Sequence, residues 1–167
     1  MAHRTHRLFL ATALMLSIAG NANAAATVGQ AAPEFTLKAM SGENIRLKEQ
    51  RGHFVLLGFW GSWCSNCPAA LQTLQQYANR YRDTGLVVLA IGVDRDPEKL
   101  RRLADDAGLS LPVLYDPFQK IGALYDVESL PTWYLIDRDG NVSAQFQRFG
   151  EDDLAPLDHA LQPRVTP

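Results

Sequence analysis

The run Phe54-Val55-Leu56-Leu57-Gly58-Phe59-Trp60-Gly61-Ser62-Trp63-Cys64-Ser65-Asn66-Cys67-Pro68 contains both cysteines of this 167-residue chain. Its first half is continuously apolar, as in a strand that is buried on both faces of a sheet. After Pro68, apolar side chains recur at helical spacing, at Leu71, Leu74, Ala78 and Tyr81. Two cysteines with the CxxC spacing, at the junction between a buried strand and a helix, predict a redox-active dithiol.

The composition is that of an ordinary globular domain, with 47% hydrophobic and 20% charged residues. A chain of this length is expected to form one domain and can bury a core without a disulfide to hold it together. A Cys64–Cys67 bridge closes a very short loop and restrains little of the unfolded chain, so a purely structural disulfide is the weaker interpretation. The formal net charge is −2 and the basic residues are scattered, so nothing in the sequence indicates binding to nucleic acid.

Residues 1–24 differ from the rest of the chain. A basic start is followed by an apolar run of 13 residues, Leu8 to Gly20, and then by Ala22-Asn23-Ala24, which supplies small residues where a signal peptidase reads. We therefore predict a cleaved signal peptide over 1–24 and a mature domain over 25–167. The alternative is an uncleaved membrane anchor, but the run is short for a span that needs about 20 residues. In a Gram-negative bacterium the exported domain would lie in the periplasm, which is kept oxidising.

Strand-like and helix-like patterns alternate along the mature chain. A hairpin comes first, with predicted strands at 33–37 and 44–47 around a Ser41-Gly42-Glu43 turn. Further strands are predicted at 54–60, 86–93, 111–115, 131–137 and 142–149. Helices are predicted from the cysteine motif to about Asp83, over 96–107 and 116–125, and from Asp152 or Asp153 to Leu161. This order predicts an α/β fold with a central mixed β-sheet and flanking helices.

Several motifs together resemble the thioredoxin-like superfamily. The segment 59–68 is similar to its active site, and Leu130-Pro131-Thr132 follows at the spacing of that family. The opening 28–37 and the segment around 94–108 resemble the extracytoplasmic TlpA/ResA/CcmG-like branch, which is related to redoxins of the AhpC/TSA type. The resemblance covers residues 28–161 and implies a thioredoxin-like fold with an N-terminal β-hairpin and a helical insert.

The resemblance also implies roles for five residues. Cys64 would be the exposed nucleophile and Cys67 the buried resolving thiol, and the two would form the redox-active disulfide. Pro131 would follow a cis peptide bond and face that disulfide, and the backbone of Leu130 would pair with an extended substrate segment. Trp63 would flank the site at the surface.

By the same resemblance, the chain is an exported thiol:disulfide oxidoreductase that acts on a disulfide of another protein. It would act as a reductant, with apocytochrome c and copper-site assembly proteins as candidate substrates. Its electrons would come from a membrane thiol carrier of the DsbD/CcdA type. We expect a monomer that needs no cofactor and no metal.

Three positions depart from the family pattern. Gly58 stands where thioredoxins carry a buried carboxylate, and Ala70 stands where TlpA/ResA-like proteins carry a glutamate. The usual proton acceptors for Cys67 are therefore both missing, and the residues alone identify no replacement. Ser129 replaces the usual glycine two residues before Pro131.

Three other functions are left open by the sequence. The dithiol could install disulfides as a periplasmic oxidant, or it could hold Cu(I) as a metallochaperone, since soft thiolates suit that ion. A peroxiredoxin-like peroxidase would need a threonine and a proline where this chain has Gly61 and Leu57.

The remaining conspicuous side chains are given structural interpretations. The histidines of the mature chain, His53 and His159, are predicted at the surface, and Trp60 is predicted in the core. A group of acidic residues is interpreted as helix caps and solvated helix faces: Asp94, Asp96, Asp105 and Asp106.

Overall fold

The computed structural model describes residues 25–147 and 154–161. The predicted signal peptide lies outside these residues, and so do Asp152 and Asp153, the predicted caps of the last helix. Among the described residues, no helix is both long and apolar enough to cross a membrane.

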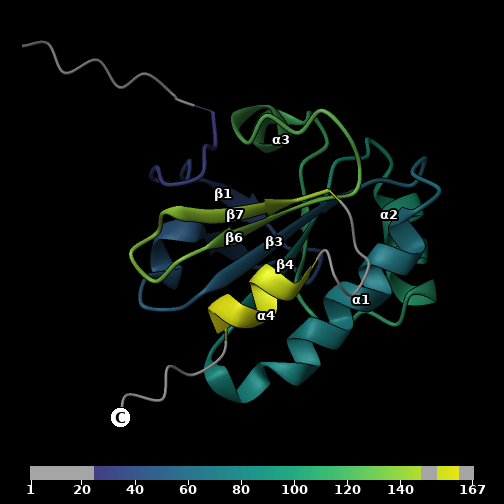
Figure 1. Cartoon of the computed structure of the whole chain (residues 1–167). Helices are drawn as coiled ribbons and strands as arrows, with labels where there is room; N and C mark the ends of the chain where they lie inside the picture. Colours follow the sequence, from purple (N-terminus) through teal and green to yellow (C-terminus); the bar gives the residue numbers. More distant parts are fainter. Residues whose placement is uncertain (1–24, 148–153, 162–167) are drawn as a thin grey trace, which may run out of the picture.

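A five-stranded mixed sheet forms the centre of the molecule, in the order β5-β4-β3-β6-β7 (Figure 1). Its strands are β3 (Val55–Trp60), β4 (Val87–Gly92), β5 (Val113–Tyr115), β6 (Thr132–Ile136) and β7 (Val142–Phe146). β3 pairs in parallel with β4 and antiparallel with β6, which confirms the predicted mixed sheet. Every residue of β3 is buried, so the continuous apolar run marks the central strand.

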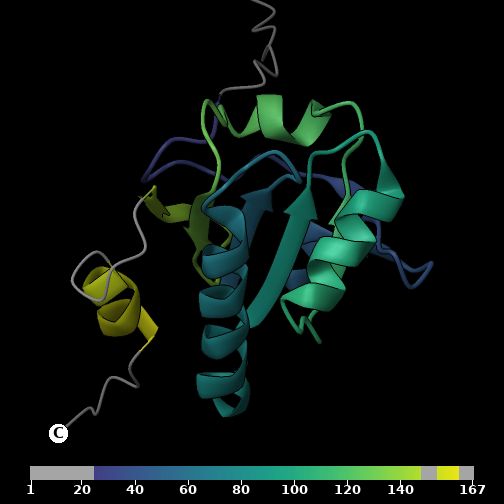
Figure 2. The same cartoon turned by 90° about the vertical axis from the view of Figure 1, so that its right-hand side faces the viewer.

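Three helices cover one face of the sheet: α1 (Cys67–Arg80), α2 (Pro97–Asp106) and α4 (Ala155–Leu161) (Figures 1 and 2). Leu71 and Leu74 of α1 lie in one buried cluster with Leu56 and Trp60, which lie on the same face of β3. Trp60 is therefore a core residue, as predicted. The N-terminus of α2 is capped by Asp96, whose carboxylate accepts hydrogen bonds from two backbone N–H groups of the first turn.

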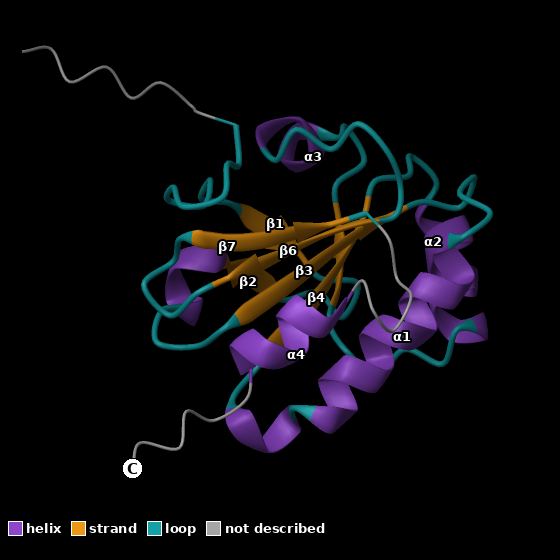
Figure 3. Ribbon diagram, in the orientation of Figure 1, coloured by secondary structure: helices purple, strands orange, loops and turns teal. Residues whose placement is uncertain are grey.

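The N-terminal segment and α3 (Lys120–Leu124) cover the opposite face (Figure 3). β1 (Thr36–Lys38) and β2 (Asn44–Arg46) form the predicted antiparallel hairpin, which is a separate two-stranded sheet, and a short 3-10 helix, η1 (Leu47–Gln50), follows. An aromatic cluster anchors this layer: the ring of Tyr125 lies 5.5 Å from that of Phe59 and 5.2 Å from that of Tyr134. These contacts fix the position of Tyr125, at the end of α3, from which the chain continues to Pro131.

The N-terminal segment also pairs with both edges of the central sheet. Beside β5, the Met40 N–H donates to the carbonyl of Val113 at 2.8 Å. At the start of β7, the Gly29 N–H donates to the Val142 carbonyl at 2.8 Å, and the Val142 N–H donates to the Gln30 carbonyl at 2.9 Å.

Gly58 has no room for a side chain on the face of β3 that α1 covers. A Cβ atom at this position would lie 2.8 Å from Leu74 Cδ2 and 3.3 Å from Trp133 Nε1. Real Cβ atoms essentially never approach another heavy atom within 3.0 Å. The place that a carboxylate takes in thioredoxins is therefore filled here by the side chains of Leu74 and Trp133.

Some predicted elements differ from the structure in extent. α1 ends at Arg80 rather than near Asp83, because a 3-10 turn, η2 (Arg82–Thr84), follows and Gly85 stops it with a φ of 79°. The strands predicted at 111–115 and 142–149 are shorter, and residues 148–149 lie outside the described part of the chain.

The Asp116-Pro117 pair predicted a helix that starts at Asp116, but α3 begins at Lys120. Gln119 has a φ of 54°, so the backbone is not helical immediately before Lys120. The Asp116 carboxylate still satisfies the start of the helix, because it accepts hydrogen bonds from the N–H groups of Lys120, Ile121 and Gly122 at 2.9–3.0 Å.

Candidate active site

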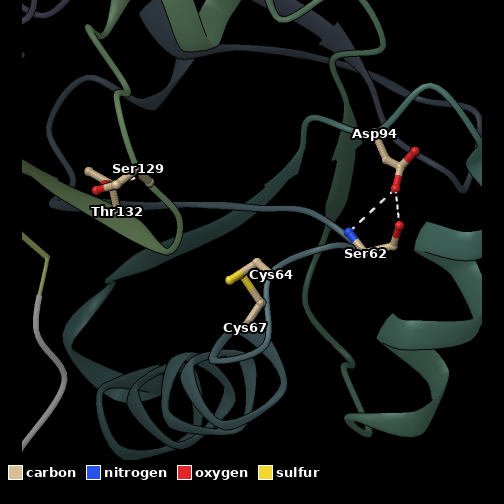
Figure 4. The surroundings of a disulfide bond; sticks show 6 residues. All are labelled: Ser62, Cys64, Cys67, Asp94, Ser129 and Thr132. Atoms are coloured by element: carbon tan, nitrogen blue, oxygen red, sulfur yellow. Dashed lines mark hydrogen bonds between the residues drawn. A yellow bond between two sulfur atoms is a disulfide. The ribbon is translucent and has the colours of Figure 1, made fainter.

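Cys64 and Cys67 form a disulfide at the start of α1 (Figure 4), with their Cα atoms 5.3 Å apart. Cys67 is the first residue of the helix and is fully buried, whereas Cys64 is partly exposed. Cys64 lies in the turn between β3 and α1, at the predicted junction of strand and helix. That turn is closed by the Cys64 N–H, which donates to the Gly61 carbonyl at 3.2 Å, and by the Cys67 N–H, which donates to the Cys64 carbonyl at 3.2 Å.

The segment before β6 forms a second wall of the site. The peptide bond between Leu130 and Pro131 is cis, as the resemblance implied. Thr132 is fully buried, and its hydroxyl donates to the Ser129 carbonyl at 2.7 Å, which holds the segment closed just ahead of the strand. Figure 4 shows Ser129 and Thr132 on one side of the disulfide and Ser62 on the other.

A groove of about 570 Å³ opens beside Cys64. Its walls include Trp63, Cys64, Val93, Gln119 and Leu130. The side chain of Trp63 is 59% exposed, so it flanks the disulfide at the surface, as predicted. Gly61 permits this arrangement, because a Cβ there would lie 3.1 Å from the Trp63 ring and 3.2 Å from Leu130.

A second pocket, of about 400 Å³, lies between α1 and Pro131. Ala70 and Thr73 of α1 line it, together with Asn66, Leu130 and Gln147. None of the described residues that line this pocket is acidic. The glutamate that TlpA/ResA-like proteins carry at the position of Ala70 thus has no substitute among these lining residues.

Asp94 is a site residue that sequence reasoning missed. It was interpreted as part of a group of caps and solvated residues, but its side chain is buried and joined to the active-site turn. Its Oδ2 accepts hydrogen bonds from the backbone N–H of Ser62, at 3.3 Å, and from the Ser62 hydroxyl, while Oδ1 accepts one from the Asp96 N–H at 3.0 Å (Figure 4). A signal was present, because Asp94 follows an apolar strand parallel to the one that leads into Cys64, and side chains that follow neighbouring parallel strands meet at one edge of the sheet.

The Asp94 carboxyl is ionised at neutral pH. Burial opposes its ionisation, but the hydrogen bonds donated by Ser62 and by the Asp96 N–H outweigh that effect and hold the pKa of Asp94 below its usual range. A negative charge is therefore fixed beside Ser62, in the turn that leads to Cys64.

His53 and His159 are both exposed, as predicted. Neither lines the groove beside Cys64 or the pocket between α1 and Pro131. In the described part of the chain, no three histidine, cysteine or acidic side chains come together as a metal site.

This geometry suits one kind of chemistry. A partly exposed sulfur that is bonded to a buried sulfur and opens on a groove can exchange its disulfide with a thiol that approaches from outside. The second sulfur is out of reach of such a thiol, so attack is confined to Cys64.

Comparison with known proteins agrees with this chemistry. The AhpC/TSA family matches residues 28–145. The thiol-disulfide oxidoreductase ResA of Bacillus thuringiensis (strain Al Hakam) is 34% identical over 140 residues, which are 84% of this chain and 79% of ResA. The thioredoxin-like protein YneN of Bacillus subtilis (strain 168) is 36% identical over 117 residues, 68% of each chain.

The fold has close counterparts among solved structures. A crystal structure from Chlorobium tepidum, described as a thiol:disulfide interchange protein DsbE, matches with a TM-score of 0.75 and 30% identity, over 81% of this chain and 99% of that one. The family match, the relatives and the Cys64–Cys67 pair at the head of α1 lead to one conclusion: the chain belongs to the AhpC/TSA family, has a thioredoxin-like fold and is a thiol-disulfide oxidoreductase.

Proposed function

We propose that this protein reduces a disulfide of a partner protein outside the cytoplasm. The observation that carries the proposal is the unequal burial of the two sulfurs, with Cys64 partly exposed on a groove and Cys67 fully buried behind it. This inequality supports the proposed roles, with Cys64 as the nucleophile and Cys67 as the resolving thiol.

The reaction proceeds in two exchanges. The Cys64 thiolate attacks one sulfur of the partner's disulfide; that bond breaks, a mixed disulfide forms, and the partner's other sulfur leaves as a thiolate. The Cys67 thiolate then attacks the Cys64 sulfur, so that the Cys64–Cys67 bond forms and the partner's second thiolate is released. Two electrons pass from the Cys64–Cys67 pair to the partner, and the departing thiolates take up the protons that the two thiols have lost.

The groove beside Cys64 holds the partner's extended segment in this proposal. Trp63 offers an exposed aromatic surface on one side, and the Leu130 backbone pairs with the segment on the other, next to Pro131. Aromatic side chains at the centre of an interface supply much of the binding energy.

The compartment and the partners belong to the same proposal. Residues 1–24 act as a cleaved signal peptide, and the mature domain works in the periplasm. Apocytochrome c or a copper-site assembly protein is the substrate, and a membrane thiol carrier of the DsbD/CcdA type restores the dithiol. Support comes from the pattern of residues 1–24 and from the similarity to ResA and to the DsbE-like structure.

The direction of electron flow is tested by the reduction potential of the Cys64–Cys67 pair. Equilibration of the mature domain with dithiothreitol or glutathione should give about −270 mV, the value of thioredoxin, or lower. Such a pair donates electrons once a dedicated carrier has reduced it. A value near that of the strong periplasmic oxidant, about −120 mV, would contradict the proposal and assign the protein to disulfide formation instead.

Trp63→Ala should impair the reaction with proteins far more than the reaction with small disulfides. Removal of the exposed ring should raise the KM for insulin, as a protein disulfide, by at least about tenfold, whereas the rate with glutathione disulfide should change by less than about twofold. Phe118→Ala is the matched control, because Phe118 is 74% exposed but does not line the groove. An equal rise in KM in both variants, or none in Trp63→Ala, would remove Trp63 from the binding surface.

A further inference from the structure

Asp94 uses both hydrogen-bond donors of Ser62, two residues before the nucleophile. The backbone N–H and the hydroxyl of Ser62 both donate to Oδ2 of Asp94 (Figure 4). A negative charge near a thiol disfavours its thiolate and raises the pKa of the thiol. These two hydrogen bonds hold the Asp94 carboxylate against the turn that carries Cys64.

The surroundings leave the charge of Asp94 only partly balanced. From α2, the Asp96 N–H donates to Oδ1, and the attraction of Lys99 also favours the carboxylate. The Lys99 ammonium, however, lies 3.9 Å from the Asp96 carboxylate, so it is shared with a second anion. From β5, Tyr115 faces the same region, and its pKa is raised by burial and by the nearby charges of Asp94 and Asp96.

This charge acts on the reduced protein. A negative charge fixed on the active-site turn disfavours a second negative charge on Cys64. When the reduced state is less stable, the disulfide is harder to reduce and its reduction potential is lower. The strong periplasmic oxidant is the opposite case, because its high potential comes from a stabilised reduced form.

We propose that the charge of Asp94, which Ser62 holds against the active-site turn, raises the pKa of the Cys64 thiol and keeps the Cys64–Cys67 pair strongly reducing. The proposal rests on the exchange function proposed above, and it names a residue that acts on the reacting sulfur without touching it.

The test replaces the carboxylate by a neutral group of the same size. In Asp94→Asn, the equilibrium constant with glutathione should shift about tenfold towards the reduced protein, which corresponds to about 30 mV for this two-electron couple. The pKa of the Cys64 thiol, followed by the ultraviolet absorbance of the thiolate, should fall in parallel. Loss of packing alone would not lower a thiol pKa and shift the redox equilibrium together.

Two matched variants serve as controls. One removes a different nearby charge, and the other alters the turn but keeps the charge of Asp94. Asp96→Asn removes a nearby charge while asparagine still caps α2, and it should leave the redox equilibrium constant within about twofold of the wild-type value. Ser62→Ala keeps the Asp94 charge, so it should not move the equilibrium towards the reduced protein. If Asp94→Asn does not fold, Asp94→Ser takes its place with the same expected shift.

Several outcomes would overturn the proposal: an unchanged equilibrium constant in the neutral Asp94 variant, a shift in the opposite direction, or an equal shift in Asp96→Asn or Ser62→Ala. The exchange function is judged separately from the wild-type protein. If the wild-type protein reduces insulin and the Asp94 variant behaves identically, only the role of Asp94 is wrong. If the wild-type protein reduces no disulfide, the proposed function is wrong as well.

Discussion

Cys64→Ser should lose disulfide exchange, with turnover of insulin reduced by roughly a thousandfold or more, as when other enzymes lose their nucleophile. The reason is geometric as well as chemical. Cys67 is fully buried in the first turn of α1, so it cannot replace Cys64 as the attacking sulfur. Turnover retained in Cys64→Ser would contradict the assignment of the nucleophile.

Cys67→Ser is the complementary variant, and it should behave differently. Cys64 can still attack a partner's disulfide, but no thiol is present to resolve the mixed disulfide, so the covalent complex should accumulate. Thiol alkylation followed by a non-reducing gel and mass spectrometry would detect the complex and identify the partner. Because the new hydroxyl is buried, thermal unfolding beside the reduced wild-type protein serves as the control for folding. A Cys67→Ser protein that is folded and exchange-competent but forms no complex would exclude the resolving role of Cys67.

Gly58→Asp should destabilise the fold strongly, although it introduces the residue type that thioredoxins carry at this position. The new Cβ would meet Leu74 Cδ2 at 2.8 Å, and a carboxylate would be buried in an apolar cluster. Overpacking and burial of an unpaired polar group should together lower the free energy of unfolding by about 3 kcal/mol or more. Denaturant titration of the variant and the wild-type protein measures the difference.

The matched control for Gly58→Asp is Gly58→Ala, which adds only the Cβ and should cost about 1–3 kcal/mol. A double variant with Leu74→Ala should show non-additive costs, because the space vacated by Leu74 receives the aspartate side chain. Wild-type stability in Gly58→Asp would mean that the core around β3 rearranges easily and that the absence of a carboxylate here has no packing cause.

The sequence was most informative where a single element determines the structure. The apolar runs of β3 and β4 identified the buried strands because burial on both faces leaves no polar position. The CxxC pair at the end of β3 identified Cys64 and Cys67 because strand, turn and helix are all contained in one short segment. Pro131 and Trp63 could be placed beside the disulfide only through the resemblance to a family.

The sequence was least informative where two distant segments meet. Asp94 was interpreted as a cap or a solvated residue because its local pattern is polar, yet its partner is Ser62, 32 positions away along the chain. The start of α3 was misplaced for a similar reason. Asp116 does satisfy the N–H groups of that helix, but the intervening backbone turns away from helical geometry at Gln119.

The pairing of the N-terminal segment with both edges of the central sheet affects how this protein can meet other chains. An open sheet edge is a template to which any extended polypeptide can add, and such addition leads to aggregation or to pairing between copies. Here Met40 occupies backbone groups beside β5, and Gly29 and Gln30 do so at the start of β7. An extended chain that binds this protein is thereby kept from these edges, while the groove between Cys64 and Leu130 stays open to it. Proteolytic removal of residues 25–30 would free the start of β7, and the protein would then have an open edge through which two copies could pair.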